Sequence, residues 1–81
     1  MKIEILGTGC QRCDQLYQNT LSAVSKIRPA SEIAVEKIGD VNYFTKMGVF
    51  MTPGLLIDGQ VVSTGKVPSA NEIMAMIEEK R

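Results

Sequence analysis

The sequence contains no histidine and no tryptophan, and only two of its 81 residues are cysteines. Without histidine, imidazole is excluded both as a metal ligand and as a proton carrier. Two tyrosines and two phenylalanines are the only aromatic side chains, and lysine plus arginine equals aspartate plus glutamate, at nine of each. Because neither a base-stacking surface nor a strong positive field is available, we expect no nucleic acid as a partner.

Long apolar runs are also missing from the sequence. None approaches the roughly 18 residues of a membrane span, and the first residues lack a basic segment followed by an apolar stretch and a cleavage site. We therefore expect a cytoplasmic protein with no membrane partner. The short length predicts a single domain over residues 1–81, which we expect to act as a monomer.

Apolar periodicity predicts four elements in the first half of the chain. Isoleucines alternate with charged residues over 2–6, which predicts a strand. Apolar residues at helical spacing run from Cys13 until Pro29, which predicts a helix of about four turns. A second strand is predicted over 32–38, and a short helix over 40–47 with an aspartate as its N-cap.

Turn residues predict a hairpin and a last helix in the second half. The apolar run 55–57, the turn dipeptide Asp58-Gly59 and the β pattern at 61–62 are typical of a hairpin. Ser69 and Glu72 form a capping box that opens the last helix. The order β-α-β-α-β-β-α predicts an α/β fold with a four-stranded mixed sheet and helices on both faces.

The two cysteines form a C-x-x-C pair, Cys10-Gln11-Arg12-Cys13, at the start of the first predicted helix. Unpaired backbone N–H groups and the helix dipole stabilise a thiolate at Cys10, and the positive charge of Arg12 lowers the pKa of that thiol further. Cys13 lies one turn inward and is more shielded. We therefore expect Cys10 to be the nucleophile and Cys13 the resolving thiol, with Gln11 and Arg12 modulating the pair.

Redox exchange is the favoured use of this pair, but metal binding and inert thiols, as in an adaptor protein that has lost catalysis, stay open. A structural staple is a weak reading, because closing a loop of about four residues restricts the unfolded chain by only roughly 2 kcal/mol. A Cu(I)-binding module or metallochaperone is the main alternative, since two thiolates can hold Cu(I). Small copper chaperones, however, have the order β-α-β-β-α-β and a methionine where this chain has Thr8. Zinc would need about two more ligands, so we expect no metal site.

Three motifs together resemble the thioredoxin superfamily. They are TGCQRC after the first predicted strand, Met51-Thr52-Pro53-Gly54 before the third, and Gly65 after the fourth. The chain is most similar to the small, glutaredoxin-sized "redox-active disulfide protein" group of archaea and bacteria, over about residues 2–77. The resemblance implies a thioredoxin-like fold and a thiol–disulfide oxidoreductase. It also implies a redox-active Cys10–Cys13 disulfide as the sole cofactor, protein disulfides as substrates and a reductase as partner.

The resemblance also implies a substrate groove. Pro53 is expected to be cis and to lie against the cysteine pair, and the backbone of Thr52 to pair with the substrate as an added strand. The apolar segment 49–51, which includes Met51, forms either the rim of that groove or ordinary core, and for Phe50 we expect core. Gly65, with the lysine that follows it, is expected to line the same groove rather than to form a plain loop.

Glu4 falls where thioredoxins carry a buried carboxylate beneath the disulfide. In that position it could accept the Cys13 proton through water. The alternative is a solvent-facing Glu4 that pairs with Lys2 or Lys37 on the surface.

Two departures limit what the resemblance implies. Gln11-Arg12 replaces the Gly-Pro of thioredoxins and the Pro-Tyr of glutaredoxins, and Gly9 replaces the tryptophan before the first cysteine. The redox potential and the choice of partner therefore do not carry over. Residues 64–67 lack the Gly-Gly and acidic pair of glutaredoxins, so the resemblance does not extend to the glutathione site.

Overall fold

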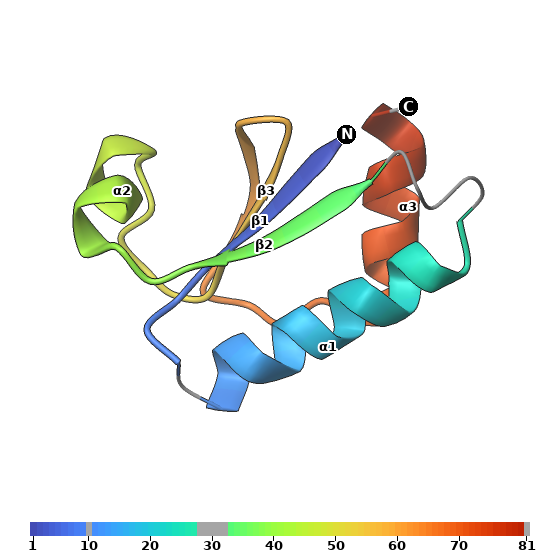
Figure 1. Cartoon of the computed structure of the whole chain (residues 1–81), viewed down its shortest axis with the longest axis horizontal. Coiled ribbons are helices and arrows are strands. Elements are labelled where there is room, and N and C mark those ends of the chain that lie inside the picture. Colours follow the sequence, from blue (N-terminus) through green and yellow to red (C-terminus); the bar gives the residue numbers. More distant parts are fainter. Residues whose placement is uncertain (10, 28–32, 81) are drawn as a thin grey trace.

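The computed structural model of the protein describes residues 1–9, 11–27 and 33–80. Its elements follow the predicted order β-α-β-α-β-β-α (Figure 1). They are β1 (Lys2–Leu6), α1 (Gln11–Ser25), β2 (Ala34–Ile38), α2 (Val41–Lys46), β3 (Gly54–Ile57), β4 (Gln60–Thr64) and α3 (Ala70–Lys80). Pro29 and the start of the predicted second strand lie outside the described residues.

The four strands form one mixed sheet in the order β2-β1-β3-β4. β1 pairs with β2 in parallel and with β3 antiparallel, and β3 pairs antiparallel with β4. The α1 crossover makes the parallel pair possible, because parallel neighbours cannot be joined by a tight turn. A tight turn instead joins β3 to β4, where Asp58 and Gly59 both have positive φ, 50° and 81°. The predicted hairpin is confirmed.

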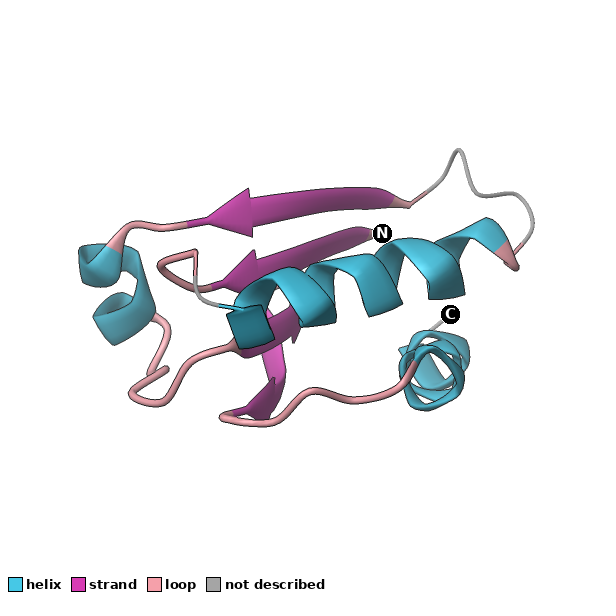
Figure 2. Ribbon diagram, turned by 90° about the horizontal axis from the view of Figure 1, so that it is seen from below, coloured by secondary structure: helices cyan, strands magenta, loops and turns pink. Residues whose placement is uncertain are grey.

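The larger hydrophobic core lies between one face of the sheet and the helices α1 and α3. Alternate strand residues point to this face. Its buried members are Ile3, Ile5, Leu16, Ala23, Val24, Ile27, Leu55, Ile57, Ile73 and Ile77. In Figure 2, α1 runs along the strands and α3 is seen end-on.

The smaller core lies on the other face, under α2. Leu6, Phe44, Val49 and Leu56 are its buried members. The prediction of helices on both faces is therefore confirmed. α2 sits at the end of the sheet opposite the chain's N- and C-termini (Figure 1), so this face is covered at one end only.

Helix caps follow the sequence signals. The Asp40 side chain accepts a hydrogen bond from the Asn42 N–H at 2.9 Å, which caps α2. Before α3, the Glu72 N–H donates to the Ser69 hydroxyl, and the Ser69 N–H donates to the Glu72 carboxylate, both at 3.2 Å. The predicted capping box is thus present. Among the described residues, no helix has the length and apolar character needed to cross a membrane.

Candidate active site

Cys13 lies in the first turn of α1 and is only 1% exposed. Its sulfur sits directly over Gly7, the residue that follows β1. A Cβ atom placed on Gly7 would lie 2.2 Å from the Cys13 Sγ and 2.8 Å from the Cys13 Cβ. The start of α1 can therefore approach the end of β1 only because residue 7 has no side chain. Burial fits the shielded, resolving thiol expected at Cys13, while Cys10 lies outside the described residues.

The register of the β1–β3 pair also leads from Gly7 toward Pro53. Leu6 is paired with Gly54 across the antiparallel β1–β3 pair. Continuing that register by one residue sets Gly7 opposite Pro53, and facing residues of antiparallel strands have Cα atoms roughly 5 Å apart. Pro53 is fully buried, and the Thr52–Pro53 peptide bond is cis. Gly7 thus has Cys13 packed on it, and the extended register places Pro53 on its other side along the sheet.

Gly65 links the loop after β4 to this site through both of its backbone groups. Its N–H donates to the Pro53 carbonyl at 2.9 Å. Its carbonyl accepts a hydrogen bond from the Arg12 guanidinium, with Nη2 2.5 Å away. Because Arg12 is the neighbour of Cys13, these two bonds tie together the start of α1, the loop before β3 and the loop after β4.

Met51 and Phe50 form an exposed apolar rim beside Gly65. A Cβ atom on Gly65 would lie 3.3 Å from the Met51 Cβ and Cε, so the Met51 side chain rests against this glycine. Met51 is 66% exposed and Phe50 is 81% exposed. The expectation that Phe50 belongs to the core is wrong. Val49 occupies the core position instead, packed against Gly54, and its neighbour Phe50 is left in solvent.

The remaining predicted groove residues lie around these contacts. Thr52 is half-buried, and Gln11, the first residue of α1, is exposed. Lys66 is exposed and borders a hollow between β4 and α3, together with Pro68 and Glu72.

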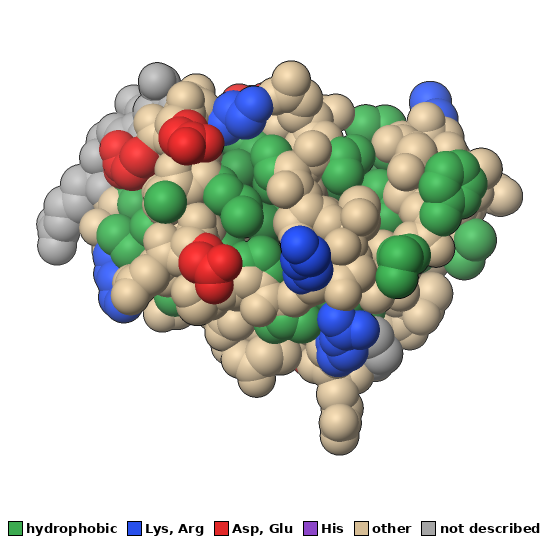
Figure 3. Space-filling model, turned by 180° about the vertical axis from the view of Figure 1, so that it is seen from behind, with side chains coloured by type: hydrophobic (Ala, Val, Ile, Leu, Met, Phe, Trp, Pro, Cys, Tyr) green, Lys and Arg blue, Asp and Glu red, His purple; other side chains and the backbone are tan. Residues whose placement is uncertain are grey.

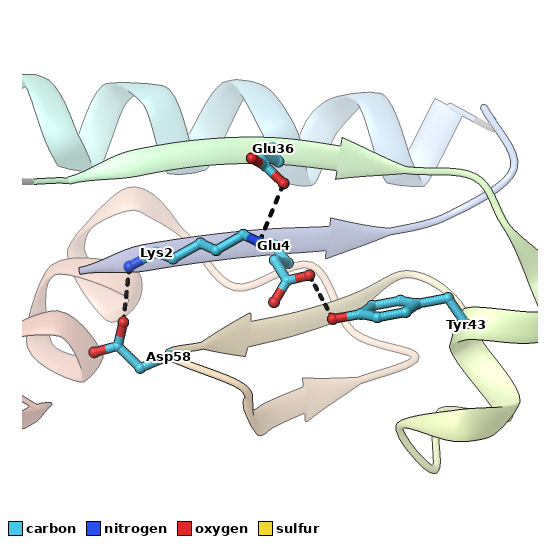
Figure 4. Close-up of polar contacts among 5 residues, drawn as sticks. All are labelled: Lys2, Glu4, Glu36, Tyr43 and Asp58. Carbon is cyan, nitrogen blue, oxygen red and sulfur yellow. Dashed lines mark hydrogen bonds and ion pairs between the residues drawn. The ribbon is translucent and has the colours of Figure 1, made fainter.

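Glu4 is buried, but on the other face of the sheet from Cys13. It is 3% exposed, and its Oε2 accepts a hydrogen bond of 2.6 Å from the Tyr43 hydroxyl (Figure 4). Tyr43 belongs to α2 and packs on the smaller core, whereas α1 covers the opposite face. The structure therefore does not bring the Glu4 carboxylate together with Cys13.

The alternative expectation, that Glu4 faces solvent and pairs with a lysine on the surface, is also wrong. Lys2 Nζ lies 3.6 Å from the Glu36 carboxylate instead (Figure 4). Lys37 Nζ is 3.0 Å from the Asp14 carboxylate, and it stacks on the ring of Tyr17 at 5.0 Å. Both candidate lysines thus have other partners.

The hydrogen bond to Glu4 raises the pKa of Tyr43 above its usual value of 10.0. Ionising the phenol would remove the donated proton. Loss of solvation and the negative charges of Glu4 and Glu36 act in the same direction. The contact between Tyr43 and Glu4 was missed from sequence, because it joins residues 39 positions apart.

Comparisons with known proteins show which family this chain is similar to. A family model described as a thioredoxin domain matches residues 1–78. A thioredoxin of Methanocaldococcus jannaschii is 44% identical over 71 residues, which are 88% of this chain and 79% of that protein. A thioredoxin of Methanothermobacter thermautotrophicus is 36% identical over 77 residues, covering 95% of this chain and 97% of that protein.

A solved structure described as that of a malarial protein shares the fold. It superposes with a TM-score of 0.72 over 96% of this chain and 93% of that chain, at 16% sequence identity. That identity is too low to bear on function. The family model and the two archaeal relatives do bear on it, and by them this chain belongs to the thioredoxin family.

Proposed function

We propose that this thioredoxin-like redox protein reduces protein disulfides through the Cys10–Cys13 dithiol. The observation that carries the proposal is the packing of the Cys13 sulfur on Gly7, at the end of β1 that pairs with the start of β3. The residue before this glycine, Leu6, pairs with Gly54, and Gly54 directly follows the buried Pro53, which supports a position of Pro53 near Cys13. A substrate chain that runs along Thr52 and Pro53 would thereby pass the start of α1, which carries Cys13 and directly follows Cys10 in the sequence.

Each turnover moves two electrons and two protons. The Cys10 thiolate attacks one sulfur of the substrate disulfide, forms a mixed disulfide and releases the other sulfur, which takes up a proton. Cys13, once deprotonated, attacks the Cys10 sulfur and expels the second substrate thiol. The products are a substrate dithiol and an oxidised Cys10–Cys13 pair. A reductase or another dithiol then returns two electrons and two protons to the pair.

The contacts of Gly65 support the substrate-binding half of the proposal. Its bonds to Pro53 and Arg12 hold the loop before β3 at a fixed position relative to α1. Thr52, adjacent to Pro53, is half-buried and follows the exposed rim at Met51. A backbone with one polar edge toward solvent can add a strand of substrate, and the main-chain hydrogen bonds supply affinity for many sequences.

No observation favours the Cu(I)-binding alternative. Both archaeal relatives carry the name thioredoxin.

The test is reduction of a protein disulfide, such as those of insulin, with dithiothreitol as the electron source. We expect the protein to accelerate the reaction, and Cys10→Ser to abolish the acceleration. Cys13→Ser should form a mixed disulfide with the substrate that mass spectrometry detects and the unmodified protein does not accumulate. The Cys10→Ser, Cys13→Ser double variant is the control. Full activity in Cys10→Ser would overturn the proposal.

A further inference from the structure

The Arg12 guanidinium is held at the rim of the candidate groove and has donors to spare. One nitrogen donates to the Gly65 carbonyl. A guanidinium carries several N–H donors in a planar fork, so one bond leaves most of them available. Within the described part of the chain, no carboxylate lies at ion-pair distance from Arg12. Asp14, the nearest acid in sequence, is engaged by Lys37 instead.

Apolar surface adjoins this cation. Met51 rests against Gly65, whose carbonyl holds Arg12, and Phe50 is the next residue along the chain. Both side chains are mostly exposed. On the face seen in Figure 3, the acidic side chains gather toward one end, while lysine and arginine side chains are spread across the face, some of them beside hydrophobic ones. The rim therefore combines a fixed positive charge with exposed apolar side chains.

We propose that Arg12 selects protein substrates in which an aspartate or glutamate lies next to the disulfide. This inference rests on the proposed function, because it concerns the substrates of that same site. A substrate strand paired along Thr52 would pass between the Met51 side and the Arg12 side of the groove. A carboxylate there completes a charge-assisted hydrogen bond with the unused guanidinium donors, while a neighbouring apolar residue covers Met51.

The expected size of the preference for an acidic substrate residue follows from the solvent exposure of Arg12. Arg12 is a surface residue, and an exposed ion pair changes an equilibrium by roughly two- to fivefold. Electrostatic complementarity of this kind acts on the choice of partner more than on the strength of binding. Because the pair stays in contact with solvent, the preference should decline as salt screens it.

The test uses two synthetic peptides, each closed by one internal disulfide and identical except for a glutamate or a glutamine beside one cysteine. The measured quantity is the ratio of kcat/KM for the two peptides. At low ionic strength we expect a roughly two- to fivefold preference for glutamate, and a ratio near one at about 1 M salt. Arg12→Gln should bring the ratio to about one at low salt.

Lys26→Gln is the matched control, because it removes the same charge beyond the far end of α1, where Lys26 is exposed. It should keep the preference of the unmodified protein. Arg12→Lys should keep a reduced preference, since the ammonium retains the charge but not the fork. A purely structural role for Arg12 would slow both peptides equally and leave the ratio unchanged in Arg12→Gln.

The outcomes separate this inference from the proposed function. Equal rates with the two peptides, or a preference that survives Arg12→Gln, would overturn the selection by Arg12 and leave the oxidoreductase intact. If Lys26→Gln loses the preference for glutamate to the same extent, the preference arises from the net charge of the protein, and the inference is overturned. Reduction of neither peptide would overturn the proposed function itself, and the inference with it.

Discussion

Gly7 is the residue on which the packing of the candidate site depends. Its missing side chain leaves the space that the Cys13 sulfur occupies. In Gly7→Ala the new methyl group would overlap that sulfur, so the start of α1 must move away from β1. We expect a loss of about 1–3 kcal/mol in the free energy of unfolding, the usual cost of overpacking, measured by denaturant unfolding.

Gly39→Ala is the control for that substitution. A Cβ atom on Gly39 would meet its nearest atom, the Gly7 carbonyl oxygen, at an ordinary 3.5 Å. We expect a change within about 0.5 kcal/mol. Equal effects of the two substitutions would show that the Cys13 contact does not limit residue 7.

Tyr43 gives the protein a measurable alkaline titration. Its pKa is raised chiefly by the hydrogen bond to Glu4. In a Tyr17→Phe background, where Tyr43 is the remaining tyrosine, the raised pKa should move the rise of the phenolate absorbance above pH 10. Glu4→Gln should lower the midpoint toward 10, because the substitution removes the carboxylate charge. An unchanged midpoint in Glu4→Gln would contradict the assignment.

The raised pKa of Tyr43 also makes the free energy of unfolding depend on pH in a defined range. Above pH 10 the unfolded chain releases the Tyr43 proton first, so the folded state binds more protons and the free energy of unfolding falls as pH rises. The contribution is complete below pH 10 and is lost once the pH passes the raised pKa. The difference between the unmodified protein and Tyr43→Phe should therefore shrink over this window, and a constant difference would exclude the linkage.

The part of the candidate site that lies in local sequence motifs could be predicted from the sequence. The C-x-x-C spacing and the Thr-Pro step identified Cys13 and Pro53 because they are local patterns. The contact of Arg12 with Gly65 joins residues that are distant in sequence, and no local rule specifies it. The prediction that Phe50 is buried failed for a related reason. Hydrophobicity predicts burial on average, whereas the rim of a groove can keep apolar side chains in solvent.

At the scale of elements, the capping box before α3 is the clearest case of a sequence signal with a measurable energy. Ser69 and Glu72 exchange hydrogen bonds between side chain and backbone. Ser69→Ala removes one acceptor and exposes an unpaired N–H group at the start of α3. We expect a loss of about 1 kcal/mol in the free energy of unfolding.

Ser25→Ala is the matched control for the cap. The Ser25 hydroxyl donates to the Ser22 carbonyl at the end of α1, where it is exposed and caps no N–H group. The change there should stay within about 0.5 kcal/mol. If both serine substitutions cost the same in denaturant unfolding, the cap contributes nothing specific.

Element boundaries were predictable where caps and turns are local. Asp40, Asp58-Gly59 and Ser69 each act through neighbours a few residues away, so their sequence signals match the structure. The order of strands in the sheet is a different matter. It depends on which apolar faces bury each other, and the sequence limited it only through the rule on parallel crossovers.

At the scale of the whole molecule, the sheet separates two cores of unequal size. The larger is closed by α1 and α3, of 15 and 11 residues. The smaller is closed by the six residues of α2 and the segment that follows it. A helix of fewer than two turns has few contacts to hold it, so this side can adjust more readily than the other.

Leu55 and Leu56 test this asymmetry as a matched pair. They are neighbours in β3, both fully buried, and they point into the larger and the smaller core respectively. Truncating a buried leucine to alanine costs about 2–5 kcal/mol, and the cost falls where the surroundings can collapse into the cavity. We expect Leu55→Ala to lower the free energy of unfolding by at least about 1 kcal/mol more than Leu56→Ala.

Denaturant unfolding of both variants at one temperature measures the difference, and thermal unfolding gives the same ranking if Leu55→Ala is partly unfolded without denaturant. An equal or larger loss in Leu56→Ala would mean that α2 is held as firmly as α1 and α3. The rim at Phe50 and Met51 would then be a rigid surface. With the expected ranking, the segment between α2 and β3 can instead shift slightly, because the core beneath it tolerates small movements, and in the proposed function this would let it fit substrates of different shape.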